Sequence, residues 1–295
     1  MKIGIDIGGS HVGIGIVNDG KIIEQEEIRI LKVDKEKIEE FIEDYLVRKI
    51  LEFNQKYKIE TIGISSAGKI NNNIIEESPN LGFKNYNLIE HLKNKTNLKD
   101  IEYLIKNDSQ CAGIAEKKYG SLRNVKNAVF LTIGTGIGGA VFVDDKLIKS
   151  KNKAEFEFGH IILKENGIKC NCGQNGCFEK YAGMKALKDN IRKKMQLDEQ
   201  TSGKEIVKII NNNPDNEIIK KVIDEYVEDL TDGLTIILNK YNVNVIDIGG
   251  GFIYYIHILL EKIKNRLEEK IKRNIDIKIA ILGNDAGIIG ATIKE

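Results

Sequence analysis

The sequence lacks an excess of charge of either sign and lacks any long apolar run. Its 295 residues carry 45 Lys+Arg against 44 Asp+Glu, a formal net charge of +1. A nucleic-acid or anionic membrane partner favours a basic excess, so a small-molecule partner is the better expectation. No apolar run reaches the roughly 18 to 20 residues of a membrane span, and no signal segment is recognisable. We therefore expect a cytoplasmic protein with no membrane and no nucleic-acid partner.

Cysteine and proline are also scarce. Only two prolines, Pro79 and Pro214, interrupt the chain, and four cysteines are too few to form a disulfide framework for this length. Three of the four lie close together, at Cys170, Cys172 and Cys177. Clustered cysteines in a reducing compartment are more often metal ligands than disulfide partners, whereas the separate Cys111 is expected to be a small buried residue.

The order of elements predicts an α/β protein built from two similar halves. Alternating apolar residues predict a meander of strands from Lys2 to Leu31, followed by a helix that Asp34 caps. After a helix that opens at Asn107-Asp108 and ends at Gly120, a second meander of strands begins at Ala128. A repeated pattern of strands and helices suggests a duplicated layered fold with a cleft between its halves. We place the lobes at 1–120, with the C-terminal helix 284–295, and at 121–283.

Each half contains a glycine-rich turn that directly follows an apolar strand. Asp6-Ile-Gly-Gly-Ser10 occupies the first half and Gly134-Thr-Gly-Ile-Gly-Gly139 the second, and Gly249-Gly250-Gly251 follows a later strand. Glycines let backbone N–H groups face a phosphate without interference from Cβ atoms. An unliganded hairpin turn is the alternative for either motif alone. Neither motif is a Walker loop or a Rossmann fingerprint, because the strand leads to another strand.

One histidine and three cysteines have the spacing of a metal site. His160, Cys170, Cys172 and Cys177 offer one imidazole and three thiols, the donor set of a closed tetrahedral zinc site. Such a site would be structural, because it leaves no position open for water. A cluster without metal is the alternative.

Taken in order, these motifs resemble the ROK family of sugar kinases and sugar-responsive repressors. The resemblance rests on the two glycine turns, Glu157-Phe-Gly-His160, the cysteine block through Glu179, Ile248-Gly-Gly-Gly251 and Leu282-Gly-Asn-Asp-Ala-Gly-Ile-Ile-Gly290, and it runs from Met1 to the last helix. It implies two actin-like, ribonuclease H-like lobes. It also implies ATP and Mg²⁺ as cofactors, a structural Zn²⁺, a sugar substrate and a homodimer.

The resemblance also implies roles for individual residues. Asp108 would be the catalytic base. Sugar would contact Asn80, Asp108, Glu157, His160 and Glu179, whereas Asp6 would position Mg²⁺ through water. Nucleotide would contact Gly8, Gly9, Ser10, Thr135, Gly136, Gly250 and Gly251. Simpler alternatives are a helix cap for Asp108, a solvated charge for Glu157 and a first-turn helix acid for Glu179.

Three departures from the family pattern concern substrate choice. Ser10-His11 replaces the usual Thr-Lys, and Gly63 to Gly68 lacks the common proline. The segment 149–156 is poor in glycine and places Phe156 next to Glu157. We expect a kinase that phosphorylates a hexose or N-acetylhexosamine, usually at the 6-hydroxyl. A catalytically silent sugar-binding relative and a sugar-responsive regulator are the alternatives. The regulators carry a DNA-binding domain before the first glycine turn, and here Asp6 lies near the start.

Overall fold

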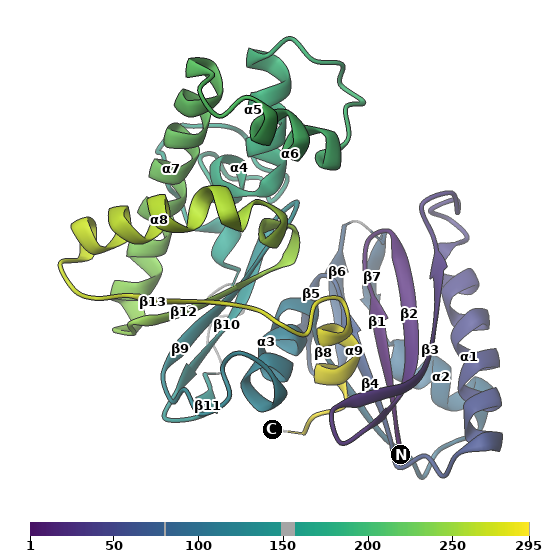
Figure 1. Ribbon diagram of the computed structural model, residues 1–295. Coiled ribbons are helices and arrows are strands. Elements are labelled where there is room, and N and C mark those ends of the chain that lie inside the picture. The colour runs from purple at the N-terminus through teal and green to yellow at the C-terminus, as the bar shows by residue number, and fades with distance from the viewer. Residues whose placement is uncertain (80, 149–156, 295) are drawn as a thin grey trace. The chain divides into compact units, whose positions relative to one another are not determined.

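The chain divides into two compact units. Met1–Arg123 together with Leu282–Glu295 forms the first, and Asn124–Ile281 forms the second. The computed structural model describes residues 1–79, 81–148 and 157–294, and Figure 1 follows the chain through its elements. Within the described residues, no helix has both the length and the apolar character needed to cross a membrane.

The first unit is built on a five-stranded sheet of order β3-β2-β1-β4-β8. Its strands are β1 (Lys2–Ile7), β2 (His11–Asn18), β3 (Lys21–Arg29), β4 (Thr61–Ser66) and β8 (Glu102–Asn107). The meander β1-β2-β3 is antiparallel, whereas β4 lies parallel to both β1 and β8. The carboxyl ends of β1, β4 and β8 therefore meet at one edge of the sheet.

Helices cover both faces of this sheet (Figure 1). The helices α1 (Ile38–Lys56) and α2 (Leu88–Thr96) lie on one face, and α3 (Asp108–Tyr119) and α9 (Asp285–Ala291) lie on the other. Contact with α9 is very close, because the carbonyl oxygens of Ile288 and Ala291 stand 2.1 Å from where Cβ atoms of Gly4 and Gly63 would lie. Only glycine at these two paired positions lets the last helix rest on the sheet.

The second unit repeats the same strand order, β11-β10-β9-β12-β13. The strands are β9 (Ala128–Ile133), β10 (Ile137–Val143), β11 (Lys146–Leu147), β12 (Val245–Gly249) and β13 (Asp276–Ile279). The accompanying helices are η1 (Phe158–His160), α4 (Glu179–Ala182), α5 (Met184–Lys194), α6 (Gly203–Asn212), α7 (Glu217–Tyr241), η2 (Gly250–Tyr255) and α8 (Ile256–Ile271). Buried residues of α5, α7 and α8 form one apolar core with β9 and β12.

A small three-stranded sheet in the first unit was not predicted. It consists of β5 (Lys69–Asn71), β6 (Ile74–Ser78) and β7 (Phe83–Tyr86), joined in the order β5-β6-β7. Asn72 and Asn73 turn the chain between β5 and β6 with positive φ angles of 47° and 65°. Asparagine tolerates that conformation, so the asparagine run was a usable hairpin signal.

Two predicted boundaries are wrong. Asp34 does not cap α1: the backbone N–H of Lys37 donates to the Asp34 carbonyl in a turn, and Lys37 occupies the cap position. The alternating apolar residues from Asp276 to Leu282 predict a strand over that whole range, but β13 ends at Ile279. In β13, the apolar alternation continues past the residue at which the backbone leaves the strand.

Candidate active site and metal centre

Two acidic side chains lie at the carboxyl-end edge of the first sheet. Asp6 is near the end of β1, and Asp108 is the first residue of α3, directly after β8. The hydroxyl of Ser65, at the end of β4, donates a hydrogen bond of 2.5 Å to Asp6 Oδ1. Ligands of open α/β sheets bind at this edge, so this is the candidate catalytic centre of the first unit.

The helix cap beside Asp108 is provided by its neighbour. Asn107 Oδ1 accepts from the N–H groups of Ser109 at 3.0 Å and Gln110 at 3.3 Å, and Asn107 is the N-cap residue of α3. Asp108 Oδ1 accepts from the Ser109 N–H at 2.7 Å. The simpler interpretation of Asp108 as the cap is therefore wrong, and its carboxylate has a position of its own at the strand end.

Burial shifts both carboxyl groups in the same direction. Burial raises the pKa of Asp6 from 3.8 to about 6, against the hydrogen bond from Ser65, and repulsion by Asp108 adds to the rise. Burial likewise raises the pKa of Asp108, although hydrogen bonds from Ser109 oppose it. Two neighbouring carboxyl groups with raised pKa values are typical of a site that binds a cation or accepts a proton, because either one supplies positive charge.

The first glycine turn forms a tight hairpin between β1 and β2. The Gly8 N–H donates to the His11 carbonyl at 3.0 Å, and Gly9 is exposed at the tip. Ser10 Oγ lies 3.1 Å from His11 Nδ1. The turn therefore lies at the same end of β1 as Asp6, with Gly9 at its exposed tip.

The second glycine turn, between β9 and β10, is held in place by the start of the helical region. The Gly134 carbonyl accepts from the Met184 N–H at 2.7 Å. A Cβ atom on Gly136 would lie 2.8 Å from Glu179 Oε2, so glycine leaves room for that carboxylate. Thr135 is exposed at the tip of the turn.

A third glycine segment follows β12. Gly250 has a positive φ of 78° and begins η2. Its missing Cβ would lie 2.9 Å from the Ile133 carbonyl at the end of β9. Gly250 and Gly251 therefore lie close to the strand that leads into the second turn.

The predicted metal ligands come together in the second unit. The ligand atoms of His160, Cys170, Cys172 and Cys177 all lie within 4.8 Å of one another. Cys170 Sγ is 3.7 Å from His160 Nδ1, and the Sγ atoms of Cys172 and Cys177 are 3.5 Å apart. Zinc with Zn–S bonds of about 2.3 Å and Zn–N bonds of about 2.0 Å holds tetrahedral ligands about 3.5 to 3.8 Å apart. The donor set and its spacing therefore fit zinc.

The thiols of this cluster also favour a cation. Burial raises the pKa of Cys170, and burial together with the neighbouring thiols raises the pKa of Cys177 to about 12. Short bridges from Ile162 to Cys177 and from Lys169 to Asn175 brace the loop. A bound metal would stabilise thiolates that the protein alone disfavours.

Glu179 lies between the cysteine cluster and the second glycine turn. Its Oε1 is 3.1 Å from Cys170 Sγ and 3.8 Å from His160 Nδ1, whereas its Oε2 occupies the space beside Gly136. Glu157 caps η1 through its backbone, and its carbonyl accepts from the His160 N–H at 2.8 Å. Of the predicted sugar ligands, His160 thus belongs to the metal cluster, Glu179 contacts it, and Glu157 is joined to His160 through its backbone.

Two predictions fall outside the described residues: the sugar ligand Asn80, and the segment 149–156 with Phe156. Ser65 and Asn107, in contrast, belong to the acidic site but were not singled out from the sequence. A serine at the end of a buried strand was the available signal for Ser65. For Asn107, the signal was its place immediately before a helix.

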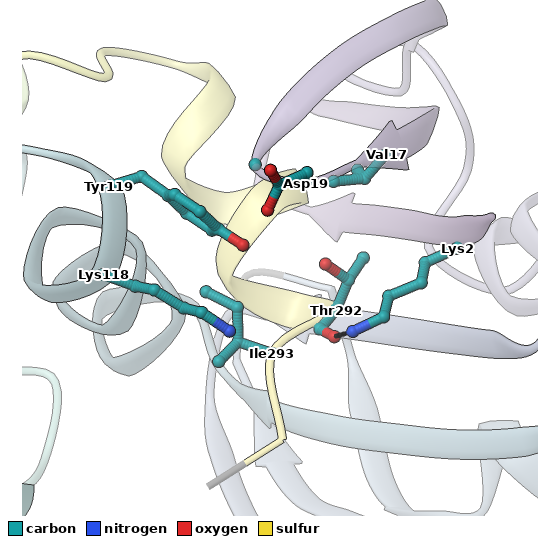
Figure 2. A pocket seen from close by; sticks show the side chains of 8 residues that line it. Lys2, Val17, Asp19, Lys118, Tyr119, Thr292 and Ile293 are labelled. Atoms are coloured by element: carbon teal, nitrogen blue, oxygen red, sulfur yellow. Dashed lines mark hydrogen bonds between the residues drawn. The ribbon is translucent and has the colours of Figure 1, made fainter.

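The first unit also has a pocket of about 280 Å³, which is shown in Figure 2. It is lined by Lys2, Val17, Asp19, Gly20, Lys118, Tyr119, Thr292 and Ile293. The Lys2 ammonium group donates to the Thr292 carbonyl at 2.9 Å. Lys2 begins β1 and Tyr119 ends α3, whereas the acidic pair lies at the opposite ends of these elements. The pocket is therefore separate from the acidic site.

Two sheets of identical order, each opening with a glycine turn, define the class of actin-like α/β folds. The model of the ROK family matches residues 2–293. The chain therefore belongs to the ROK family, as the motifs predicted.

Individual relatives agree with this assignment. The chain is 28% identical to a glucokinase of Thermotoga maritima, covering 99% of this chain and 97% of that protein. It is 27% identical to a xylose repressor of Bacillus spizizenii, covering 97% of this chain and 73% of the repressor. The crystal structure of a ROK family glucokinase from Streptomyces griseus, in complex with glucose and AMPPNP, matches with a TM-score of 0.82 at 22% identity, covering 99% of this chain and 97% of that one. The last likeness supports the predicted fold.

Proposed function

We propose that the protein is an ATP-dependent sugar kinase. It transfers the γ-phosphoryl group of ATP to the 6-hydroxyl of a hexose or N-acetylhexosamine. The observation that carries this proposal is Asp108, a carboxylate with a raised pKa at a strand end, next to a glycine turn in a chain of the ROK family. The glucokinase relatives support the same enzyme class.

Asp108 acts as the general base. Its carboxylate accepts the proton of the sugar hydroxyl as that oxygen bonds to the γ-phosphorus, and the bond from phosphorus to the β–γ bridging oxygen breaks to release ADP. Because Asn107 caps the helix, Asp108 keeps its orientation without carrying the cap itself. A raised pKa brings the proton affinity of a carboxylate closer to what the transfer requires.

Asp6 serves the metal that accompanies ATP. Mg²⁺ would neutralise phosphate charge, and Asp6 would hold it through water while Ser65 orients the carboxylate. The residues Gly8, Gly9, Ser10, Thr135 and Gly136 contact the phosphates, and Gly250 and Gly251 let the adenosine end approach the backbone. Exposed turn tips at Gly9 and Thr135 support these roles.

The cysteine cluster positions residues that bind the sugar. Zinc bound by His160 and the three cysteines would fix the loop as a structural ion, because no coordination position remains open. His160 would hold the metal through Nδ1, which lies 3.7 Å from Cys170 Sγ, and its Nε2 would then be available to a sugar hydroxyl. Glu157, Glu179 and Asn80 complete the hydrogen bonds to the sugar. The cytoplasmic location and the homodimer, implied by the family, remain predictions.

The test is a coupled assay of ADP release across hexoses, 2-acetamido sugars and β-glucosides at saturating MgATP. A kinase gives ADP release that depends on one class of sugar, whereas the Asp108→Asn variant binds that sugar and releases almost no ADP. Wild-type protein that binds a sugar without releasing ADP would instead be a silent relative or a regulator. The xylose repressor match makes that second candidate worth measuring.

A further inference from the structure

Glu116, in the last turns of α3, is a buried carboxylate that the proposed reaction does not use. Its side chain is fully enclosed, with a relative exposure of 0%. Oε1 accepts from the Leu282 N–H at 2.7 Å, and Oε2 accepts from the Ser121 N–H at 2.8 Å and from Ser121 Oγ at 3.1 Å. Hydrogen bonds to a buried charge are strong, so these partners are tightly held.

These partners lie where the chain passes between the two units. It leaves the first unit after Arg123 and returns to it at Leu282. One carboxylate thus holds Ser121 just before the first passage and Leu282 just after the second. The Glu116 carbonyl adds hydrogen bonds from the N–H groups of Gly120 at 3.0 Å and Leu122 at 3.2 Å.

Gly120, at the end of α3, leaves the space that the Glu116 carboxylate occupies. A Cβ atom on Gly120 would lie 1.8 Å from Glu116 Oε2, and 2.9 Å from the Glu116 Cα atom. No other residue fits there while the carboxylate keeps its place. Gly120 has a φ of −113°, so glycine is required by space and not by backbone conformation.

The same carboxylate connects to the acidic pair through two helices. Asp108 begins α3, the helix that contains Glu116. Leu282 leads into α9, where Gly287 lies against Asp6: a Cβ atom there would be 2.7 Å from Asp6 Oδ1. Gly290 of α9 packs still more closely on α3, because a Cβ atom there would lie 1.8 Å from the Cys111 carbonyl oxygen. Glu116 therefore connects α3, which begins with Asp108, to the segment leading into α9, which packs against Asp6.

We propose that Glu116 is a positioning residue that fastens both inter-unit connections to α3. It thereby holds α3, which begins with Asp108, and α9, which packs against Asp6, in fixed positions relative to each other. The catalytic part of this inference rests on the proposed kinase function. The fastening itself is a property of the fold.

The test compares Glu116→Gln with Glu43→Gln. Glutamine offers one acceptor oxygen, so it cannot accept from both connections. Glu43 is the matched control: it is buried in the same unit, on α1, and its carboxylate is bound by Tyr86, His91 and Lys95, away from both connections. Each protein is measured by amide hydrogen exchange and by steady-state kinetics.

In Glu116→Gln we expect amide exchange at Ser121 and Leu282 to accelerate about tenfold or more. We also expect kcat to fall about tenfold to a hundredfold while the KM for sugar changes little, because small displacements of a catalytic group cost rate before binding. Glu43→Gln should lower the melting temperature and leave both the exchange at these amides and kcat near wild type.

If Glu116→Gln does not fold, Ser121→Ala removes one of the three donors and should give a weaker form of the same pattern. Unchanged exchange at Ser121 and Leu282 would overturn the proposal, as would an equal loss of kcat in Glu43→Gln. If the wild-type protein phosphorylates no sugar, the kinase proposal fails on its own, and the exchange measurement still decides whether Glu116 fastens the connections.

Discussion

The two sheets share a strand order but carry different chemistry. In the first sheet the outer parallel strand β8 leads to Asn107-Asp108, and in the second β13 leads to Asn284-Asp285, each pair opening a helix. Asn107 has extended backbone and caps α3, whereas Asn284 is helical and makes no side-chain cap. The same Asn-Asp sequence thus has a different backbone conformation and a different capping role in the two places. A repeated sequence motif therefore need not form a repeated site.

The largest expected effect separates these two aspartates. Asp108→Asn removes the proposed base and should lower kcat by about 10² to 10⁴, with sugar binding partly retained. Asp285→Asn makes the same chemical change at the matching position and should lower kcat less than about tenfold. Steady-state ADP release together with calorimetric sugar binding measures both. Equal losses in the two variants would show that the comparison between the motifs does not locate the base.

The next effect contrasts the cysteines of the two units. Cys172→Ser should abolish the bound zinc, expected at about one ion per chain, and weaken sugar affinity by about tenfold or more, because His160 loses its orientation. Cys111→Ala, in the first unit, should keep its zinc. Metal analysis of freshly purified protein, followed by sugar titration, tests this. Protein free of zinc before any mutation would refute the metal assignment.

A third prediction concerns how the stability of the protein depends on pH. Because burial raises the pKa of Asp6 from 3.8 to about 6, its folded state binds the proton more tightly than its unfolded state does. That contribution to stability is complete below about pH 4 and is lost as pH rises through about 6. Across this pH range and in the absence of Mg²⁺, the free energy of unfolding of Asp6→Asn should therefore rise relative to wild type by up to about 3 kcal/mol.

Thermal unfolding between pH 4 and pH 8 measures that gain. Asp19→Asn, which changes an exposed carboxylate in the turn between β2 and β3, is the control and should show no such trend. A difference between Asp6→Asn and wild type that stays constant with pH would argue against a raised pKa at Asp6.

The sequence predicted the features that are formed by residues close together along the chain. Both strand meanders, the glycine turns and the gathering of His160 with its cysteines are confirmed, because each is encoded within a short stretch. The partners that tune the acidic site could not be predicted in this way. Ser65 is 59 positions from Asp6, and Leu282 is 166 positions from Glu116. Such pairs are set by which strands and helices lie side by side.

The roles assigned to Asn80, Glu157, His160 and Glu179 remain predictions. The structure places Glu179 and His160 beside the cysteine cluster, which is consistent with a metal that orders the sugar ligands. The pair Asn284-Asp285 shows the limit of motif reasoning, because its sequence matches Asn107-Asp108, which contains the proposed base, and its backbone conformation does not.

The central claim is the transfer of a phosphoryl group from ATP to a sugar hydroxyl, with Asp108 as the base. It is tested most directly by ³¹P NMR of a reaction with the sugar that the ADP screen selects. The account predicts one new sugar-phosphate resonance growing in equal amount to ADP, and neither product from Asp108→Asn. ADP accompanied by inorganic phosphate alone, or undiminished sugar phosphate from the variant, would contradict it.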